Sequence, residues 1–321
     1  LICMRKFLVF FIVVLAFSCK KDDKTEKEIA TIPVFFEVKR FDKAFANASP
    51  EQLPQLKTAF PYLFPEQFND SVWINRMKDS LQRELLSEVQ KAFPSIENEE
   101  GELRQLFQHT KYYFTDFEEP TVVTLTSDVD YNNRVIYADS LLLIALDNYL
   151  GPEHKFYYGI QQYLKKNFTS AMITVDVAGQ IARSRMQYPN DRTFLGQMVL
   201  HGKELYLKDL LIPFKTDAEK IGYTPKEIEW AQANAEEIWR YFIENNLLYD
   251  TSLKTQERFV REAPFSKFYL ELDNQAPGRL GQFIGWQIVR AYMQNNDVPL
   301  QQMLSAPADE IFKKSRFKPK K

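Results

Sequence analysis

The chain has 321 residues with 41 Lys and Arg against 43 Asp and Glu, and its formal net charge of −2 argues against nucleic acid as a partner. Hydrophobic residues make up 45% of the chain and aromatic residues 14%, which is enough to bury a substantial core. Both cysteines, Cys3 and Cys19, lie near the N-terminus, which excludes a disulfide framework inside a folded domain.

Residues 1–18 are typical of a bacterial secretory signal. The basic Arg5 and Lys6 precede an unbroken apolar run over residues 7–17, the length expected of a signal-peptide core. A spanning helix needs about 20 apolar residues, so this run is too short to cross a bilayer. The sequence Leu-Ala-Phe-Ser-Cys that ends at Cys19 resembles a lipobox, so we expect cleavage before Cys19 and attachment of acyl chains, palmitate among them. The alternative is an ordinary signal peptide in which this cysteine is incidental.

Residues 19–30 are predicted to form a charged, flexible tether beyond the lipid. Residues 20–23, Lys-Lys-Asp-Asp, are similar to the signal that sends some lipoproteins to the outer membrane. Residues 31–321 contain no Pro/Gly/Ser-rich linker and no internal repeat, which indicates a single domain. We therefore expect a lipid-anchored protein of the cell envelope, held at the outer membrane, with the leaflet left open.

Three segments predict strands of one small sheet. Residues 32–38 are rich in β-branched and aromatic residues, as are residues 121–126 and 134–138. Asp and Asn residues between the last two segments favour a turn.

Most other segments have the spacing of amphipathic helices. Apolar residues over 74–89 mark one face of a single long helix, and those over 103–114 mark a second helix. Thr224 and Glu227 form a capping box with Pro225 at the first helical position, which predicts that a helix begins there. The predicted fold class is therefore α+β, predominantly α-helical, with a small β-sheet and surrounding helices.

One carboxylate falls within an apolar helical stretch. Asp176 lies in residues 172–182, where most neighbours are apolar, so we expect its side chain to be half-buried. It either contacts a ligand or pairs with a nearby cation, Arg183 or a lysine. The ion pair is the favoured interpretation.

The residue types of the common catalytic centres are missing or scattered. His109, His154 and His201 are far apart in the sequence and form no HExxH pair for zinc. The predicted domain has no cysteine and no G-x-S-x-G motif. The sequence therefore predicts no catalytic residue, no metal and no cofactor.

Two glycines mark the helical segment over residues 277–293. Gly281 and Gly285 are four residues apart and therefore share one face of a helix. Each costs up to about 1 kcal/mol relative to alanine in a helix, which indicates that another backbone packs closely against this face. The alternative is that these glycines line a groove.

Several segments together resemble the gliding-motility lipoprotein family GldB over essentially the whole chain. They are the lipobox, Phe41-Asp42, and residues 146–151, 199–206, 238–242, 263–265 and 277–293. The resemblance implies an envelope lipoprotein required for gliding over surfaces, which works with the machinery that exports and moves surface adhesins. Its partners would be other envelope proteins of the gliding and secretion machinery, and its acylated N-terminus would contact the lipid membrane.

A weaker resemblance concerns the fold. A small sheet, helices and a glycine-containing helix are similar to zinc-dependent peptidases of the HExxH class. Asp176 and Gln180 would stand where those enzymes have two histidines, and His201 would mark the third ligand segment. Because the histidine pair and the glutamate base are absent, this resemblance implies a degenerate zincin-like fold that neither holds zinc nor activates water.

These observations favour a non-catalytic, membrane-anchored component of the gliding apparatus that binds another envelope protein or an extended peptide. The main alternative is a zinc-dependent, peptidase-like envelope hydrolase, which the missing ligands oppose. A solute-binding lipoprotein is a third class, and it would need a deep pocket lined by aromatic residues.

Overall fold

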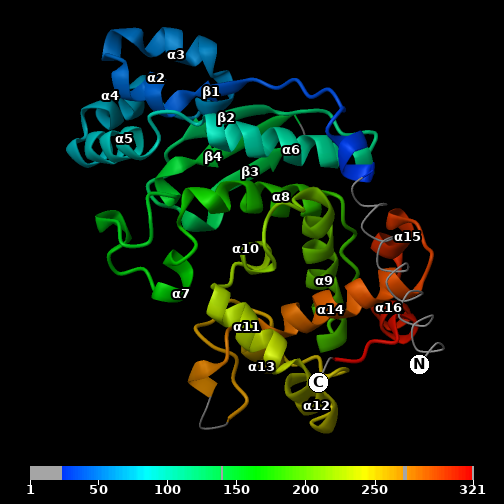
Figure 1. The fold of residues 1–321 in the computed structure, drawn as a ribbon. Helices are drawn as coiled ribbons and strands as arrows, with labels where there is room; N and C mark the ends of the chain where they lie inside the picture. The colour runs from blue at the N-terminus through cyan, green and yellow to red at the C-terminus, as the bar shows by residue number, and fades with distance from the viewer. Residues whose placement is uncertain (1–23, 139, 270–272, 320–321) are drawn as a thin grey trace, which may run out of the picture.

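The computed structural model describes residues 24–138, 140–269 and 273–319 (Figure 1). Cys19 and the predicted signal peptide, residues 1–18, lie outside the described residues. The strands are β1 (Val38–Arg40), β2 (Thr121–Leu125), β3 (Val135–Ala138) and β4 (Leu141–Ala145). The α-helices are α2 (Phe41–Asn47), α3 (Leu53–Ala59), α4 (Asp70–Lys78), α5 (Ser80–Ala92), α6 (Glu97–Tyr113), α7 (Gln162–Lys165), α8 (Ile173–Ser184), α9 (Phe194–Leu211), α10 (Asp217–Ile221), α11 (Pro225–Ala233), α12 (Ala235–Glu244), α13 (Leu253–Phe259), α14 (Leu280–Asn295), α15 (Leu300–Ser305) and α16 (Ala308–Ser315).

The four strands form one mixed sheet in the order β1-β2-β4-β3. β1, β2 and β4 run parallel, and β3 is antiparallel to β4 at the edge. The predominantly helical α+β class is therefore confirmed. β4 was not among the predicted strands, because its continuous apolar sequence lacks the alternation of a half-exposed strand.

The first predicted strand, residues 32–38, is wrong over most of its length. Only Val38–Arg40 pairs with β2. The Arg104 side chain on α6 donates a hydrogen bond to the Val34 carbonyl at 2.8 Å, and Gln108 donates to the Ile32 carbonyl at 3.1 Å. Side chains of α6 therefore satisfy backbone groups that a neighbouring strand would otherwise bond.

The single long helix predicted over residues 74–89 is also wrong. The chain forms α4 and α5 instead, with Asp79 between them in an extended conformation. The Asp79 carboxylate accepts a hydrogen bond from the Gln82 backbone N–H at 2.7 Å. Asp79 acts as an N-cap for α5, which compensates for the interrupted helix.

The predicted tether is shorter than expected, because residues 24–29 are helical. Ile29 is only 1% exposed, and the Glu26 carboxylate lies 3.1 Å from His109 Nε2 on α6. The folded domain therefore begins before residue 31. Within the described residues, the helices are all too short or too polar to span a bilayer.

The sheet separates two hydrophobic cores. Val122 and Leu142 point into the larger core, which contains α6, α8, α9 and α14. Val123 faces the smaller core beneath α2, α3 and α5, where Leu141 and Leu143 also pack. Figure 1 shows α2–α5 gathered on the side of β1 and β2 away from α8 and α9. Because side chains alternate along a strand, the buried sheet stabilises both layers.

Helix α14 crosses α9 at very short range. A β-carbon built on Gly285 would lie 1.8 Å from the Met198 carbonyl oxygen of α9. A β-carbon on Gly281 would lie 2.8 Å from the Phe259 carbonyl oxygen. These distances leave no room for a side chain, so both glycines face neighbouring backbone.

Candidate functional site

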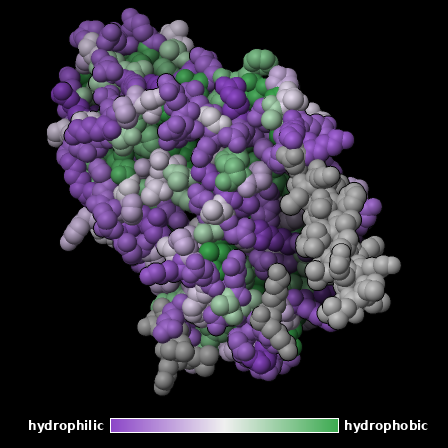
Figure 2. All heavy atoms as spheres, viewed as in Figure 1, coloured by the Kyte–Doolittle hydropathy of each residue, from purple (hydrophilic) through white to green (hydrophobic). Residues whose placement is uncertain are grey.

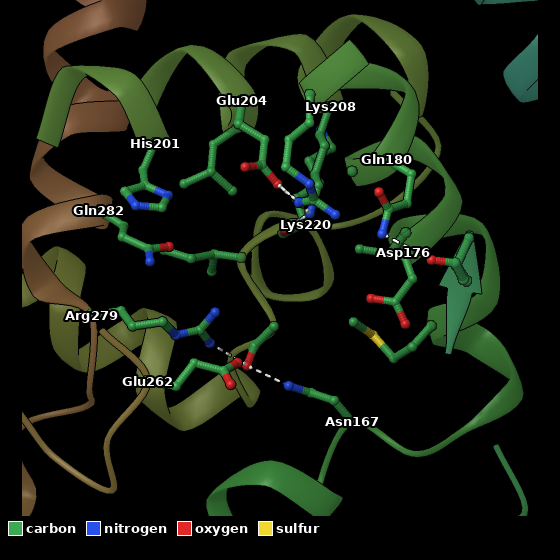
Figure 3. Close-up of a pocket in the computed structure, with 18 of the residues that line it drawn as sticks. Asn167, Asp176, Gln180, His201, Glu204, Lys208, Lys220, Glu262, Arg279 and Gln282 are labelled. Carbon is green, nitrogen blue, oxygen red and sulfur yellow. Dashed lines mark hydrogen bonds and ion pairs between the residues drawn. The ribbon is translucent and has the colours of Figure 1, made fainter. Parts of the chain in front are cut away.

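A polar pocket of about 260 Å³ lies between the facing sides of α8 and α9 (Figure 3). The α10 end and the start of α14 contribute further walls. Its charged lining consists of five cationic residues and three acidic ones, namely Arg134, Arg183, Lys208, Lys220 and Arg279, with Asp176, Glu204 and Glu262. Figure 2 shows a mostly hydrophilic face with scattered apolar areas.

The helical repeat explains how α9 lines the pocket. His201, Glu204 and Lys208 are spaced by three and four residues and therefore lie along one face of α9, as Figure 3 shows. A β-carbon on Gly179 of α8 would lie 3.3 Å from Lys208 Cε and 3.4 Å from Glu204 Oε1. The missing side chain at Gly179 lets the charged groups of α9 rest directly on α8.

Asp176 is held by two partners at the pocket wall. Arg134, which precedes β3, binds the carboxylate through Nε at 2.7 Å and Nη2 at 2.9 Å. The Tyr149 hydroxyl donates to Asp176 Oδ2 at 2.9 Å. The ion-pair interpretation therefore holds, but the cation is Arg134 and not Arg183, because α8 turns this carboxylate toward the sheet.

Arg183 pairs with Glu204 instead. Its Nη1 lies 2.6 Å from Glu204 Oε1, which joins α8 to α9. The Lys208 ammonium lies 3.9 Å from the same oxygen and donates to the Lys220 carbonyl at 3.2 Å. Burial lowers the pKa of Lys208. Lys208 therefore shares one carboxylate with a more closely bound arginine.

Gln180 and His201 line the same pocket but differ in their contacts. The Gln180 side chain donates to the Val135 carbonyl on β3 at 2.9 Å. The His201 ring has no hydrogen-bond partner within the described part of the chain. Burial lowers the pKa of His201, with nearby Arg279 acting in the same direction. A neutral imidazole therefore presents one donor and one acceptor to the pocket.

Arg279 and Glu262 complete the open side of the pocket, where Figure 3 shows them near each other. Arg279 has a φ of 60° at the N-cap of α14, and its Nη2 donates to the Gly222 carbonyl at 3.1 Å. Asn167 donates to the same carbonyl at 3.1 Å. Among the described residues neither Arg279 nor Glu262 forms an ion pair, and the Arg279 guanidinium lies 5.5 Å from the centre of the Tyr223 ring. Both side chains can therefore contact a ligand in the pocket.

The structure thus brings Asp176, Gln180 and His201 to one pocket, as the zincin-like interpretation required. No group of three His, Cys, Asp or Glu side chains in residues 24–138, 140–269 and 273–319 could hold a metal ion. Asp176 is bound by Arg134 and Gln180 by β3, so the shared location does not make a ligand set. The zincin-like fold gains no support from this arrangement.

Sequence reasoning missed most of the charged lining, including Lys208, Lys220, Glu262 and Arg279. One local signal was present in the sequence. His201, Glu204 and Lys208 recur at helical spacing within an otherwise largely apolar helix. Such a polar stripe indicates either a solvent-facing side or a polar cavity, and only the packing of α8 against it distinguishes the two.

Comparisons with curated proteins and with solved structures find no match. The model of the family described as gliding motility protein GldB matches residues 22–319, which is nearly the whole chain. The match includes every residue that lines the pocket. This chain therefore belongs to the GldB family of gliding motility proteins.

Proposed function

We propose that this protein is a lipid-anchored, non-catalytic component of the gliding machinery and its adhesin export system. In this proposal the pocket between α8 and α9 binds a segment of another envelope protein. The observation that carries the proposal is the combination of engaged acids and available recognition groups in one pocket. Asp176 and Glu204 are bound by arginines, whereas His201 and Arg279 have free hydrogen-bonding capacity.

The hydrogen bonds of Asp176 and Glu204 argue against these two carboxylates as a general base or a metal ligand, and Glu262 alone does not make a metal site in the described part of the chain. A general base or a metal ligand needs a free lone pair directed at the substrate or ion. Both oxygens of Asp176 already accept hydrogen bonds, from Arg134 and from Tyr149. Glu204 is held at 2.6 Å by Arg183. A zinc-dependent hydrolase is therefore not proposed.

The size of the pocket favours a short segment of chain. Its volume of about 260 Å³ is below the range of about 300 to 1,000 Å³ common for sites that enclose a drug-sized ligand. The polar lining also differs from the aromatic lining that a solute-binding lipoprotein would need. One or two residues of a partner protein would fill the space, with the rest of the partner lying on the surrounding surface.

The proposal is tested by complementation of a deletion strain. Arg279→Gln and His201→Ala should each reduce gliding while the protein stays folded and anchored, as shown by its melting temperature and by membrane fractionation. Arg261→Gln is the matched control, because this exposed arginine lies in the same connection between α13 and α14 as Arg279 but does not line the pocket. Wild-type gliding in both pocket variants would rule out the proposed role of the pocket.

We further propose residence at the outer membrane, supported by residues 20–23 and by membership of a lipoprotein family. Separation of inner and outer membranes from cells that produce the protein tests this location. Protease treatment of intact cells then separates the two leaflets. Digestion of the domain indicates surface exposure, and full protection in cells with a sealed outer membrane indicates that it faces the periplasm.

A further inference from the structure

The charges around the pocket do not cancel. Five cationic side chains and three carboxylates line it. Asp209, which pairs with Lys220 at 3.1 Å, adds a fourth carboxylate. Arg290 binds both Asp209 and Asp217. Including Arg290 and Asp217 in the sum adds one positive and one negative charge and leaves the net charge unchanged. His201 is neutral, because burial lowers its pKa. The described residues therefore leave one net positive charge at the pocket.

Lys208 and Arg279 are the two lining cations that no carboxylate binds at hydrogen-bond distance, and with the negative charge of Glu262 they leave the one net positive charge. Arg134 and Arg183 are each matched by one carboxylate, Asp176 and Glu204. Lys208 is buried and lies 3.9 Å from Glu204, beyond ordinary hydrogen-bond distance. Arg279 donates only to a backbone carbonyl among the described residues. Lys208 is a buried cation whose neighbouring carboxylate, Glu204, is bound more closely by Arg183, and Arg279 is a half-buried cation. Burial makes an incompletely neutralised charge costly, so an anion that reaches both groups would stabilise this arrangement.

We infer that the pocket binds a peptide carboxylate, which enters between Arg279 and Lys208 beside the neutral ring of His201. The inference rests on the proposed function, because it names the chemistry by which a partner segment is recognised. A single negative charge brings the sum at the pocket to zero. The two sources of this group in a protein are an Asp or Glu side chain and the C-terminal end of a chain.

The geometry favours a carboxylate over a phosphate. The planar guanidinium of Arg279 matches the two oxygens of a carboxylate, and Lys208 and His201 supply single donors from α9. A phosphate group carries up to two negative charges, which would exceed the excess at the pocket. The unpaired carboxylate of Glu262 on the open side repels a second negative charge and suits a peptide N–H.

Binding is measured on the purified lipidated chain in an uncharged detergent. Three acetylated tripeptides serve as probes: trialanine with a free carboxylate, Ala-Asp-Ala amide and trialanine amide. Dissociation constants come from saturation-transfer NMR titrations at low salt, with inorganic phosphate as a separate probe. The variants are Arg279→Gln and Lys208→Met, and Arg261→Gln is the matched control, with the melting temperature of each variant recorded.

We expect at least one acidic tripeptide to bind about tenfold or more tightly than trialanine amide. The preferred probe identifies the source as a chain end or an acidic side chain. Arg279→Gln should abolish the preference and Arg261→Gln should retain it, and Lys208→Met provides a second test if it folds. Equal affinity for the neutral probe, or tighter binding of inorganic phosphate, would overturn the inference.

The result also separates this inference from the proposed function. If the tripeptides show no carboxylate preference while Arg279→Gln cells fail to glide, the pocket functions through other chemistry and only the inference is wrong. If the preference is present while Arg279→Gln cells glide normally, the carboxylate site exists and the proposed function of the pocket is wrong.

Discussion

Gly202 of α9 and Gly285 of α14 face each other where the two helices cross, and a β-carbon on Gly202 would lie 2.3 Å from the Gly285 carbonyl oxygen. The residue before Gly202 is His201, which lines the polar pocket. Gln282, one turn before Gly285, lines it as well. The close helix crossing therefore fixes the distance between two walls of the candidate site.

This crossing makes a prediction for stability. Gly285→Leu should lower the free energy of unfolding by about 3 kcal/mol or more, because its β-carbon alone would overlap the Met198 carbonyl. Gly101→Ala is the matched control at an exposed position of α6, where a β-carbon meets nothing within 4 Å. The control should gain about 0.5 to 1 kcal/mol. Urea denaturation measures both, and an unchanged midpoint for Gly285→Leu would contradict the described helix contact.

Lys203 predicts a pH dependence of stability. Its ammonium donates to the Leu304 carbonyl at 2.9 Å and the Ala306 carbonyl at 2.8 Å, and burial lowers its pKa from 10.5 to about 8. Below pH 8 the lysine is protonated in both states and the burial penalty is fully present. Between pH 8 and 10.5 only the folded state loses the proton, so stability relative to Lys203→Met should rise with pH, by an amount on the order of 3 kcal/mol.

The measurement is the difference in unfolding free energy between the two proteins at several pH values. Taking the difference removes the tyrosine titrations that both proteins share. A difference that stays constant from pH 8 to 10.5 would show that Lys203 is not desolvated in the folded state.

Asp176 is predicted to be structural. Asp176→Asn should lower the free energy of unfolding by about 1 to 3 kcal/mol, because Arg134 loses its charged partner. EDTA should leave the melting temperature of the wild-type protein unchanged, since no described cluster could hold a metal. Elemental analysis of the purified protein checks the second statement. Stoichiometric zinc that is lost in His201→Ala would revive the hydrolase interpretation.

Membrane attachment is predicted to depend on Cys19. Cys19→Ala should detach the domain from membranes or stop its processing, because two or more acyl chains are needed for stable anchoring. Circular dichroism should show an unchanged fold. The assay compares membrane fractions and incorporation of labelled fatty acid, and a variant that remains fully membrane-bound would require a different anchor.

Local chemistry made part of the fold predictable. The capping box at Thr224 is confirmed, since its side chain accepts from the Glu227 backbone N–H at 3.2 Å and α11 starts at Pro225. Thr224 and Glu227 are three positions apart, so their interaction needs no distant part of the chain. The same holds for the helical assignment around Asp176, where the apolar spacing of α8 is visible in the sequence.

Other elements depended on distant partners. Residues 32–38 have strand-like composition, but side chains of α6 donate hydrogen bonds to the backbone carbonyls of Ile32, Pro33 and Val34. The break between α4 and α5 at Asp79 could not be predicted, because the helical spacing of apolar residues continues across it. The Asp79 carboxylate stabilises the start of α5. Composition and periodicity indicate which residues are buried. They do not indicate which groups form hydrogen bonds with a given backbone segment.

The sequence by itself determined the family, the predominantly helical class and the expectation of a lipid anchor, since each depends on residues read in order. The tertiary structure alone decided that Arg134 pairs with Asp176 from 42 positions away and that Arg279 and Lys208 border one pocket. The physical reason is that electrostatic pairing depends on distance in space. Chain folding sets that distance through packing contacts, such as Gly285 against Met198, which join segments far apart in the sequence.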